Sequence, residues 1–195
     1  MAKKESSLLQ LVLSLTIIAL VAGVGLAAVY SVTKEPIAEA QLKKKMDAIA
    51  EVLPGFSGET QELKFMPESG KDSITVYLAK QNGELFGGAV ETYTDIAYSG
   101  RFTIMVGFDA QGLITGTSVL QMGETPGLGD KIDKKKDVFP YQFEGKDPQN
   151  FKLKVKKDGG DVDAITAATI SSRAFCDATE RAYKIYMLAK EASHE

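Results

Sequence analysis

Residues 73–120 read SITVYLAKQNGELFGGAVETYTDIAYSGRFTIMVGFDAQGLITGTSVL. This stretch contains four runs rich in β-branched and aromatic residues: Ile74 to Ala79, Leu85 to Tyr93, Phe102 to Phe108 and Leu113 to Val119. The sequences Gln81-Asn82-Gly83 and Asp109-Ala110-Gln111-Gly112 are typical of turns between strands. Because links of hairpin length join neighbouring runs, the pattern predicts an antiparallel meander and not alternating β-α-β units.

The sequence beyond the meander predicts one more strand and a long helix. Hydrophobic residues alternate from Phe151 to Val155, which indicates a fifth strand. From Thr169 to Glu191 the period changes to that of a helix. One face of this helix is apolar and carries Ile170, Ala174, Ala178, Ala182, Ile185 and Leu188. The fold class is therefore α+β, an antiparallel sheet covered by helices.

Length and composition limit the classes of function. The chain has 195 residues, of which 44% are hydrophobic and 25% charged, and this suits one membrane anchor and one folded domain. The formal net charge is −3, and no basic stripe with interleaved aromatic residues is present, which argues against nucleic-acid binding. Residues 134–136 are three lysines, but Asp130, Asp133 and Asp137 flank them, so we expect a solvated turn.

Two residue types occur once each and exclude several kinds of site. A single cysteine, Cys176, cannot form an internal disulfide, and on the terminal helix it is expected to be a small buried residue and not a redox thiol. A single histidine, His194, cannot build a multi-histidine metal site, and its place near the chain end does not suit a catalytic triad. No metal site is predicted, and any acid-base role falls to a carboxylate, a tyrosine or a lysine.

The stretch Leu8–Val32 is the candidate membrane anchor. It reads LLQLVLSLTIIALVAGVGLAAVYSV and carries no charge, so as a helix it is long enough to cross a bilayer. A cleaved signal peptide is the alternative, because Lys3 and Lys4 precede the run and Ala27-Ala28 are small. The run is longer than the apolar part of a signal peptide, which favours a retained anchor. Lysines lie on both sides of it, so charge does not decide its orientation.

Helical spacing continues after the apolar run. Between Glu35 and Leu53 the apolar residues recur at roughly helical intervals until Pro54-Gly55 ends the pattern, which predicts an amphipathic connecting helix packed on the domain. The mixed sign of its charges argues against a membrane-surface helix. The expected division is an anchor at residues 1–33, a connecting helix at 34–55 and a folded domain at 56–195.

The segment from Asp163 to Ser171 reads DAITAATIS and lies where a loop becomes the terminal helix. By itself it predicts a hydroxyl-rich helix start, where ordinary capping is commoner than phosphate binding. It resembles the flavinylation motif of FMN-binding domains, an Asp followed by Ser/Thr-Gly-Ala-Thr, in which the last Thr is esterified to the phosphate of FMN. The resemblance implies these cofactor-site residues: Asp163, Thr166, Ala167, Ala168, Thr169 (the covalent attachment point), Ile170 and Ser171. Ala167 departs from the usual Gly, which adds a methyl group in a tight loop.

A second segment, Gly123–Gly129, reads GETPGLG and is by itself a Pro-Gly turn. It closely resembles another hallmark of the same family, in the same order along the chain. We expect its glycines to let backbone approach the flavin, and Pro126 and Leu128 to offer apolar surface to the ring. The implied site residues are Glu124, Thr125, Pro126, Gly127, Leu128, Gly129 and Lys131.

Taken as a whole, the chain resembles the G subunit of the Rnf ion-translocating electron-transport complex. This resemblance implies an N-terminal membrane helix and an FMN-binding domain outside the cytoplasm, at the bacterial or archaeal cell membrane. It implies electron transfer through covalent FMN within a ferredoxin:NAD oxidoreductase coupled to sodium or proton translocation, beside other membrane subunits. It also implies a maturation enzyme, a flavin transferase that uses FAD and Mg²⁺ and takes the Thr169 hydroxyl as acceptor, with Asp163 helping recognition or activation.

Three alternatives stay open on the sequence. The related C subunit of the sodium-pumping NADH:quinone reductase shares both motifs but is typically longer, and a stand-alone extracytoplasmic flavin carrier has the same chemistry. A flavin-free structural assembly module is the third, with Ala167 as its sign. Near the expected site, Tyr93, Tyr98 and Arg101 are candidates to approach the flavin ring, although residues in and beside strands more often serve packing or the surface.

Overall fold

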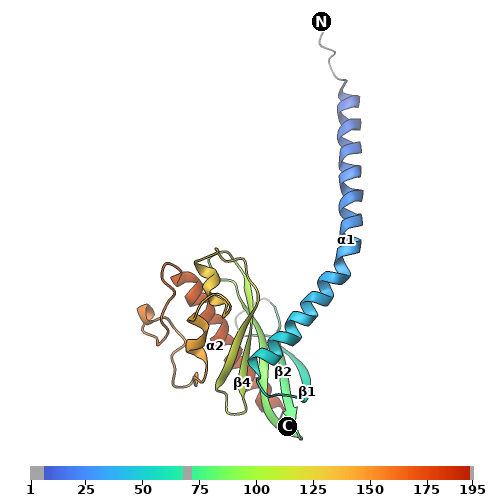
Figure 1. Cartoon of the computed structure of the whole chain (residues 1–195). Coiled ribbons are helices and arrows are strands. Elements are labelled where there is room, and N and C mark those ends of the chain that lie inside the picture. Colours follow the sequence, from blue (N-terminus) through green and yellow to red (C-terminus); the bar gives the residue numbers. More distant parts are fainter. Residues whose placement is uncertain (1–6, 68–71, 194–195) are drawn as a thin grey trace. The chain divides into compact units, whose positions relative to one another are not determined.

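The structure is a computed structural model that describes residues 7–67 and 72–193, so Lys3, Lys4 and His194 lie outside the described residues. It divides into two compact units, Met1–Lys43 and Lys44–Glu195, each described by itself. Figure 1 traces the elements along the chain. In order they are α1 (Leu8–Val52), β1 (Glu59–Phe65), β2 (Ile74–Gln81), β3 (Glu84–Thr94), β4 (Phe102–Asp109), β5 (Ile114–Gln121), the 3-10 turns η1 (Gly129–Ile132), η2 (Phe139–Phe143) and η3 (Lys156–Asp158), and α2 (Thr169–Ala192).

The first unit contains α1 as far as Lys43. This helix is long and apolar enough to cross a membrane, and no other helix in the described part of the chain is. The few hydroxyl groups of its apolar run bond within the helix: Ser14 donates to the carbonyl of Leu11, and Thr16 donates to that of Val12. Polar groups in hydrocarbon must find partners in their own segment, and these hydroxyls do so. The anchor predicted at Leu8–Val32 is therefore a single uninterrupted helix.

The predicted connecting helix is the continuation of the same helix. One element runs from Leu8 to Val52, with Pro36 inside it. Proline lacks the N–H that would bond to the carbonyl four residues earlier, so one backbone hydrogen bond of the helix is missing at this point. Its last turns, from Lys44 onward, belong to the second unit and carry the buried residues Ala48 and Val52.

The sheet is a five-stranded antiparallel meander in the order β1-β2-β3-β4-β5. Its register places Val76 opposite Val90, and Val90 opposite Val106. The four strands predicted between residues 73 and 120 are confirmed to within two residues at each end. The edge strand β1 was not predicted, because its sequence ETQELKF is polar and most of its residues are exposed.

The strand predicted at Phe151–Val155 is wrong. Within it only Val155 forms a bridge, an isolated parallel one with Val162. The local chain folds back on itself instead, since the Lys156 N–H donates to the Val162 carbonyl and the Lys152 N–H to the Asp161 carboxylate. The alternating pattern arises because Leu153 and Val155 are buried in the core while their neighbours are exposed.

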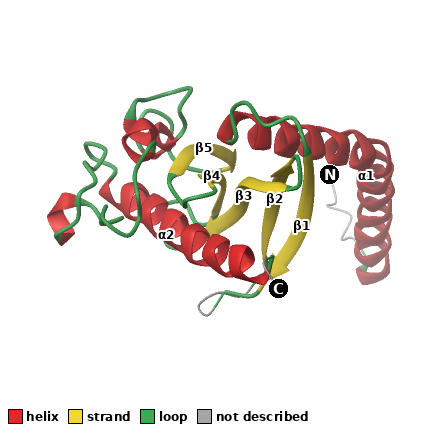
Figure 2. Ribbon diagram, turned by 90° about the horizontal axis from the view of Figure 1, so that it is seen from below, coloured by secondary structure: helices red, strands yellow, loops and turns green. Residues whose placement is uncertain are grey.

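Helix α2 covers one face of the sheet, as Figure 2 shows. Phe108 of β4 stacks on Tyr186 of α2, with ring centroids 4.9 Å apart and an angle of 13° between the planes. A Cβ atom at Gly88 of β3 would lie 2.7 Å from the Tyr186 ring, so a side chain there would push the helix away. The predicted helix is confirmed, and it begins at Thr169.

The last turns of α1 cover the opposite face. Ala48, Val52 and Leu53 are buried with Ala89 of β3 and Met105 of β4 in a second apolar cluster. This packing is also close, because a Cβ atom at Gly107 would lie 2.2 Å from the Val52 carbonyl oxygen. The sheet is therefore a middle layer with a helix on each side. The loops at the start of α2 lie outside these layers and form the candidate site described below.

Candidate functional site

A cavity of about 450 Å³ brings together three segments that lie far apart in the sequence. They are the loop between β3 and β4, the segment that follows β5, and the start of α2. Nine of its ten lining residues belong to the two segments singled out in the sequence. The lining consists of Tyr98, Glu124, Thr125, Leu128, Gly129, Ala167, Ala168, Thr169, Ile170 and Ser171.

Glu124 links all three segments. Its side chain is buried, with only 7% of the residue exposed. One carboxylate oxygen accepts a hydrogen bond from the Ser99 N–H at 2.9 Å, and the other accepts one from the Ser171 hydroxyl at 2.5 Å. A buried carboxylate needs such donors, because an unpaired charge away from water is costly. The glutamate predicted to approach the cofactor thus holds the walls of the cavity together.

Gly129 is required by this arrangement. A Cβ atom at residue 129 would lie 2.1 Å from a Glu124 carboxylate oxygen and 2.6 Å from the Ser171 hydroxyl oxygen. Any side chain would therefore displace the hydrogen bond between these two residues. The turn before it is closed by a 3.1 Å hydrogen bond from the Leu128 N–H to the Thr125 carbonyl, and Gly127 has a φ of +77°. Glycine at these two positions allows the backbone to pass close beside the carboxylate.

Thr169 is the first residue of α2, and the residue before it cannot cap the helix. The N-cap is Ala168, which has no side-chain acceptor for the first N–H groups of the helix. Those N–H groups and the positive end of the helix dipole favour an anion such as phosphate. Ser172 fixes the entry into the helix, since its hydroxyl accepts from the Ile165 N–H at 2.9 Å and donates to the Ala168 carbonyl at 3.0 Å. The helix start therefore combines a threonine hydroxyl with backbone donors that no side chain at the N-cap satisfies.

Ala167 adopts a left-handed backbone conformation, with a φ of +63°. Alanine is disfavoured there because its Cβ atom approaches the backbone, whereas glycine has no such steric penalty. The methyl group is exposed and is not buried against another wall of the loop. The loop thus keeps a conformation that favours glycine, although the residue is alanine.

Three of the predicted site residues lie in a neighbouring depression of about 350 Å³ and do not line the main cavity. They are Lys131, Asp163 and Thr166. Gln142 fixes the backbone beside them, because its side-chain oxygen accepts from the Asp163 N–H at 2.8 Å and its amide donates to the Asp163 carbonyl at 3.1 Å. The Asp163 side chain itself pairs with Lys156 at 2.8 Å. The Asp163–Ser171 segment therefore borders two hollows, one at each end.

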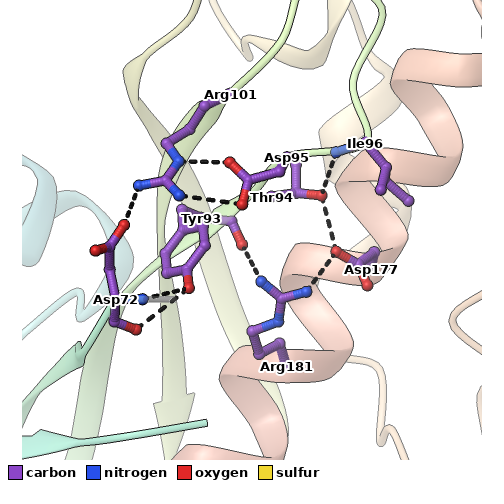
Figure 3. A network of polar contacts seen from close by, with 8 residues as sticks. All are labelled: Asp72, Tyr93, Thr94, Asp95, Ile96, Arg101, Asp177 and Arg181. Carbon is purple, nitrogen blue, oxygen red and sulfur yellow. Dashed lines mark hydrogen bonds and ion pairs between the residues drawn. The ribbon is translucent and has the colours of Figure 1, made fainter. Parts of the chain in front are cut away.

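Of the remaining candidates, Pro126 and Gly127 are exposed and line neither hollow. Tyr93 and Arg101 do not line the cavity either. The two residues contact each other, since Arg101 lies over the Tyr93 ring, 4.2 Å from its centroid (Figure 3). Tyr98 does line the cavity. The sequence alone did not separate Tyr98 from the other two candidates, because Tyr98 lies in a turn-like stretch beside Ser99 and Gly100.

Two further groups have shifted pKa values with clear causes. A hydrogen bond from Lys136, at 2.7 Å, lowers the pKa of the buried Asp130 carboxyl in η1. Burial raises the pKa of the Cys176 thiol to about 12, so the thiol stays protonated at neutral pH, as expected of a small core residue. Among residues 7–67 and 72–193, no cluster of three or more His, Cys, Asp or Glu residues is arranged to hold a metal ion.

Comparison with known proteins shows the family. The G subunit of the ion-translocating oxidoreductase complex of Aliivibrio fischeri (strain ATCC 700601 / ES114) is 36% identical over 198 residues, which cover 96% of this chain and 92% of the relative. The chain belongs to this G-subunit family. The corresponding proteins of Pseudomonas aeruginosa (strain UCBPP-PA14) and Escherichia coli (strain K12) are 35% and 37% identical, over 97% and 80% of this chain and 94% and 80% of their own lengths.

Two family models divide the chain. The RnfG N-terminal region matches residues 1–52 and ends at the last residue of α1. The FMN-binding domain matches residues 97–184, a range that includes all ten residues lining the cavity. The chain therefore contains a membrane anchor followed in the sequence by an FMN-binding domain. The residues of the cavity fit this cofactor, because ligand sites of about 300–1,000 Å³ are typical and a helix start without a side-chain cap suits its phosphate.

Proposed function

We propose that this chain is the flavin-carrying electron-transfer subunit of a membrane-bound Rnf-type ferredoxin:NAD oxidoreductase coupled to sodium or proton translocation, with FMN joined to the Thr169 side-chain oxygen by a phosphoester bond. The observation that carries the proposal is the position of Thr169 at the uncapped start of α2, inside the cavity that the GETPGLG segment also lines. Membership of the G-subunit family supports the assignment to the complex.

Bound FMN supplies the electron-accepting and electron-donating chemistry, and the protein positions it. The N–H groups of the first turn of α2 stabilise the negative phosphate next to Thr169. The Glu124 bridge keeps the GETPGLG segment at a fixed place beside the helix start. Leu128 and Ile170, which are 42% and 46% exposed, offer apolar surface at the cavity. Covalent attachment keeps the cofactor at this place without a need for high noncovalent affinity.

Attachment requires a separate flavin transferase in this proposal. The enzyme takes FMN from FAD with the help of Mg²⁺, the Thr169 hydroxyl is the acceptor, and AMP leaves. Asp163 and Thr166 lie outside the flavin cavity, in the neighbouring depression, which is consistent with a role in recognition by the transferase. A variant Asp163→Ala that is flavinylated at the wild-type rate would contradict this role for Asp163.

The proposed location is the cell membrane, with α1 as a single span and the FMN-binding domain on the extracytoplasmic side. Other membrane subunits of the complex are the expected partners. Labelling of cysteines introduced at an exposed position such as Thr166, in intact cells and after lysis, tests the side directly. Labelling in intact cells supports an extracytoplasmic domain, and labelling only after lysis contradicts it.

Intact mass and in-gel flavin fluorescence of the native protein test the attachment. We expect the mass of one FMN less one water above the chain mass, lost in Thr169→Ala and kept in Thr125→Ala, which removes another threonine from the same cavity. Native protein without the added mass and without fluorescence would favour a flavin-free assembly module. Isolation of the intact complex and identification of its companions separates an Rnf subunit from a quinone-reductase subunit or a stand-alone carrier.

A further inference from the structure

We propose that Tyr98 stacks on the isoalloxazine ring of the bound flavin and fixes the orientation of that ring. The inference rests on the proposed FMN site and adds a residue that neither motif contains. Tyr98 lies in the loop between β3 and β4, yet it lines the same cavity as Thr169 at the start of α2. It supplies the aromatic surface of a lining whose large apolar members are otherwise Leu128 and Ile170.

The Tyr98 side chain is unpacked where a ligand would lie. The residue is 70% exposed, whereas Tyr93, five residues earlier, is only 6% exposed. A tyrosine ring presents a large apolar surface, and aromatic rings gain by offset stacking on other flat rings. An exposed ring at the edge of a cavity therefore has both the surface and the freedom to stack on a planar cofactor.

Hydrogen bonds hold the loop that carries Tyr98 on the α2 side. The Thr94 hydroxyl donates to the Asp177 carboxylate of α2 at 2.8 Å and accepts from the Ile96 N–H at 3.5 Å (Figure 3). On the other side of Tyr98, the Ser99 N–H donates to Glu124 at 2.9 Å. The start of the loop is thus tied to α2, and the residue next to Tyr98 is tied to Glu124, which lines the cavity.

Arg101 braces the far end of the same loop. Its guanidinium group donates two hydrogen bonds to the Asp95 carboxylate, at 2.6 Å and 3.0 Å, and also pairs with Asp72 (Figure 3). Bidentate pairs of this kind fix geometry as well as adding energy. The loop is therefore held at both ends while the Tyr98 side chain between them stays exposed. Such preorganisation favours binding, because the backbone of the loop loses little freedom when the flavin ring docks on Tyr98.

Flavin emission provides a test that does not depend on activity. A phenol stacked on a flavin donates an electron to the light-excited ring, and the pair recombines without emission, so no net oxidation takes place. Phenylalanine keeps the stacking surface but lacks the phenol. Tyr98→Phe is therefore expected to raise emission per bound flavin several-fold while the visible circular dichroism of the flavin is kept. Tyr98→Leu is expected to raise emission and to diminish the dichroism as well.

The measurement uses the full-length chain co-expressed with a flavin transferase, with the bound FMN quantified by intact mass. Tyr141→Phe is the matched control, since Tyr141 is also exposed, at 51%, and does not line the cavity. If Tyr98→Phe carries FMN and emits at the wild-type level per flavin, the stacking proposal is overturned while the proposed FMN site stands. If the wild-type chain carries no FMN, both proposals are overturned. A rise confined to the Tyr98 variants supports the stacking.

Discussion

The Ser171 hydroxyl donates a 2.5 Å hydrogen bond to the carboxylate of Glu124, a residue 47 positions earlier in the chain. Both residues are buried, and the second carboxylate oxygen is held by the Ser99 N–H. One acidic side chain thus joins the β3–β4 loop, the GETPGLG segment and α2. Because the bond is buried, its loss leaves one oxygen of a buried carboxyl group without a donor and weakens the contact between the GETPGLG segment and α2.

We therefore expect Ser171→Ala to lower the free energy of unfolding by about 1–3 kcal/mol, since Glu124 loses a buried donor. Denaturant unfolding of the full chain in detergent, followed by circular dichroism, measures this change. Thr166→Ala is the control, because Thr166 is an exposed hydroxyl residue of the same loop and its loss should change the free energy by less than about 0.5 kcal/mol. Equal stability of Ser171→Ala and wild type would contradict the structural role of this bond.

The close approach at Gly129 makes a second prediction. Gly129→Ala places a methyl group against the Glu124–Ser171 hydrogen bond, so we expect a loss of about 1–3 kcal/mol in unfolding free energy and less covalent flavin. Gly123→Ala, in the same segment, is the matched control. A Cβ atom at residue 123 meets nothing nearer than 4.0 Å, so this variant should load flavin like the wild type. Intact mass measures the covalent flavin, and denaturant unfolding measures the free energy of unfolding. Similar values for both variants would contradict the steric explanation for Gly129.

The backbone at residue 167 predicts a stabilising substitution. Ala167→Gly relieves the steric cost of a left-handed alanine, which is about 1–2 kcal/mol, and part of that gain is offset by the greater freedom of glycine in the unfolded chain. We expect a net rise of up to about 1 kcal/mol in the free energy of unfolding. Ala168→Gly should lower it instead, because Ala168 is buried and has a φ of −132°. Thermal unfolding of the two variants side by side decides between these signs.

The ion pair between Asp130 and Lys136 makes stability depend on pH. Lys136 lowers the pKa of the folded Asp130 carboxyl below its ordinary value of 3.8, so the pair contributes stability above pH 3.8 that is lost as the pH falls through the lowered value. The stability difference between wild type and Lys136→Met should thus be largest near neutral pH and should shrink as the pH falls well below 3.8. The neighbouring exposed Lys135→Met should show little difference at either pH. A constant Lys136 effect from neutral to strongly acidic pH would exclude this linkage.

The central part of the fold can be predicted from sequence because the central strands and α2 are buried in a periodic pattern. β2 and β4 alternate between the core under α2 and the core under α1, and this produces the alternation that reveals strands. The edge strand β1 has little apolar surface to reveal it. Leu153 and Val155 imitate a strand because two anchoring residues of an irregular loop happen to be two positions apart. Backbone hydrogen bonds decide such cases, and they are not visible in a hydrophobic pattern.

The site could be predicted in its motifs but not in its internal contacts. The two motif segments do meet around one cavity. However, nothing in the residue pattern indicates that Glu124 bonds to Ser171, or that Lys131, Asp163 and Thr166 border a different hollow. The sequence named Tyr98 as a candidate together with Tyr93 and Arg101, and only the three-dimensional arrangement shows that Tyr98 alone of the three lines the cavity. Local motifs predict the attachment chemistry, whereas packing between segments that are distant in the sequence determines which other residues line the cavity.

The burial of Ala48, Val52 and Leu53 against the sheet determines where a water-soluble fragment can begin. A fragment starting after residue 53 would uncover an apolar sheet face around Met105 and is expected to aggregate. A fragment that starts near Lys44 keeps this covering and omits the membrane span. A protease acting between the span and Lys44 would likewise release a domain with its core intact, so the anchor can be cut away without exposing the interior.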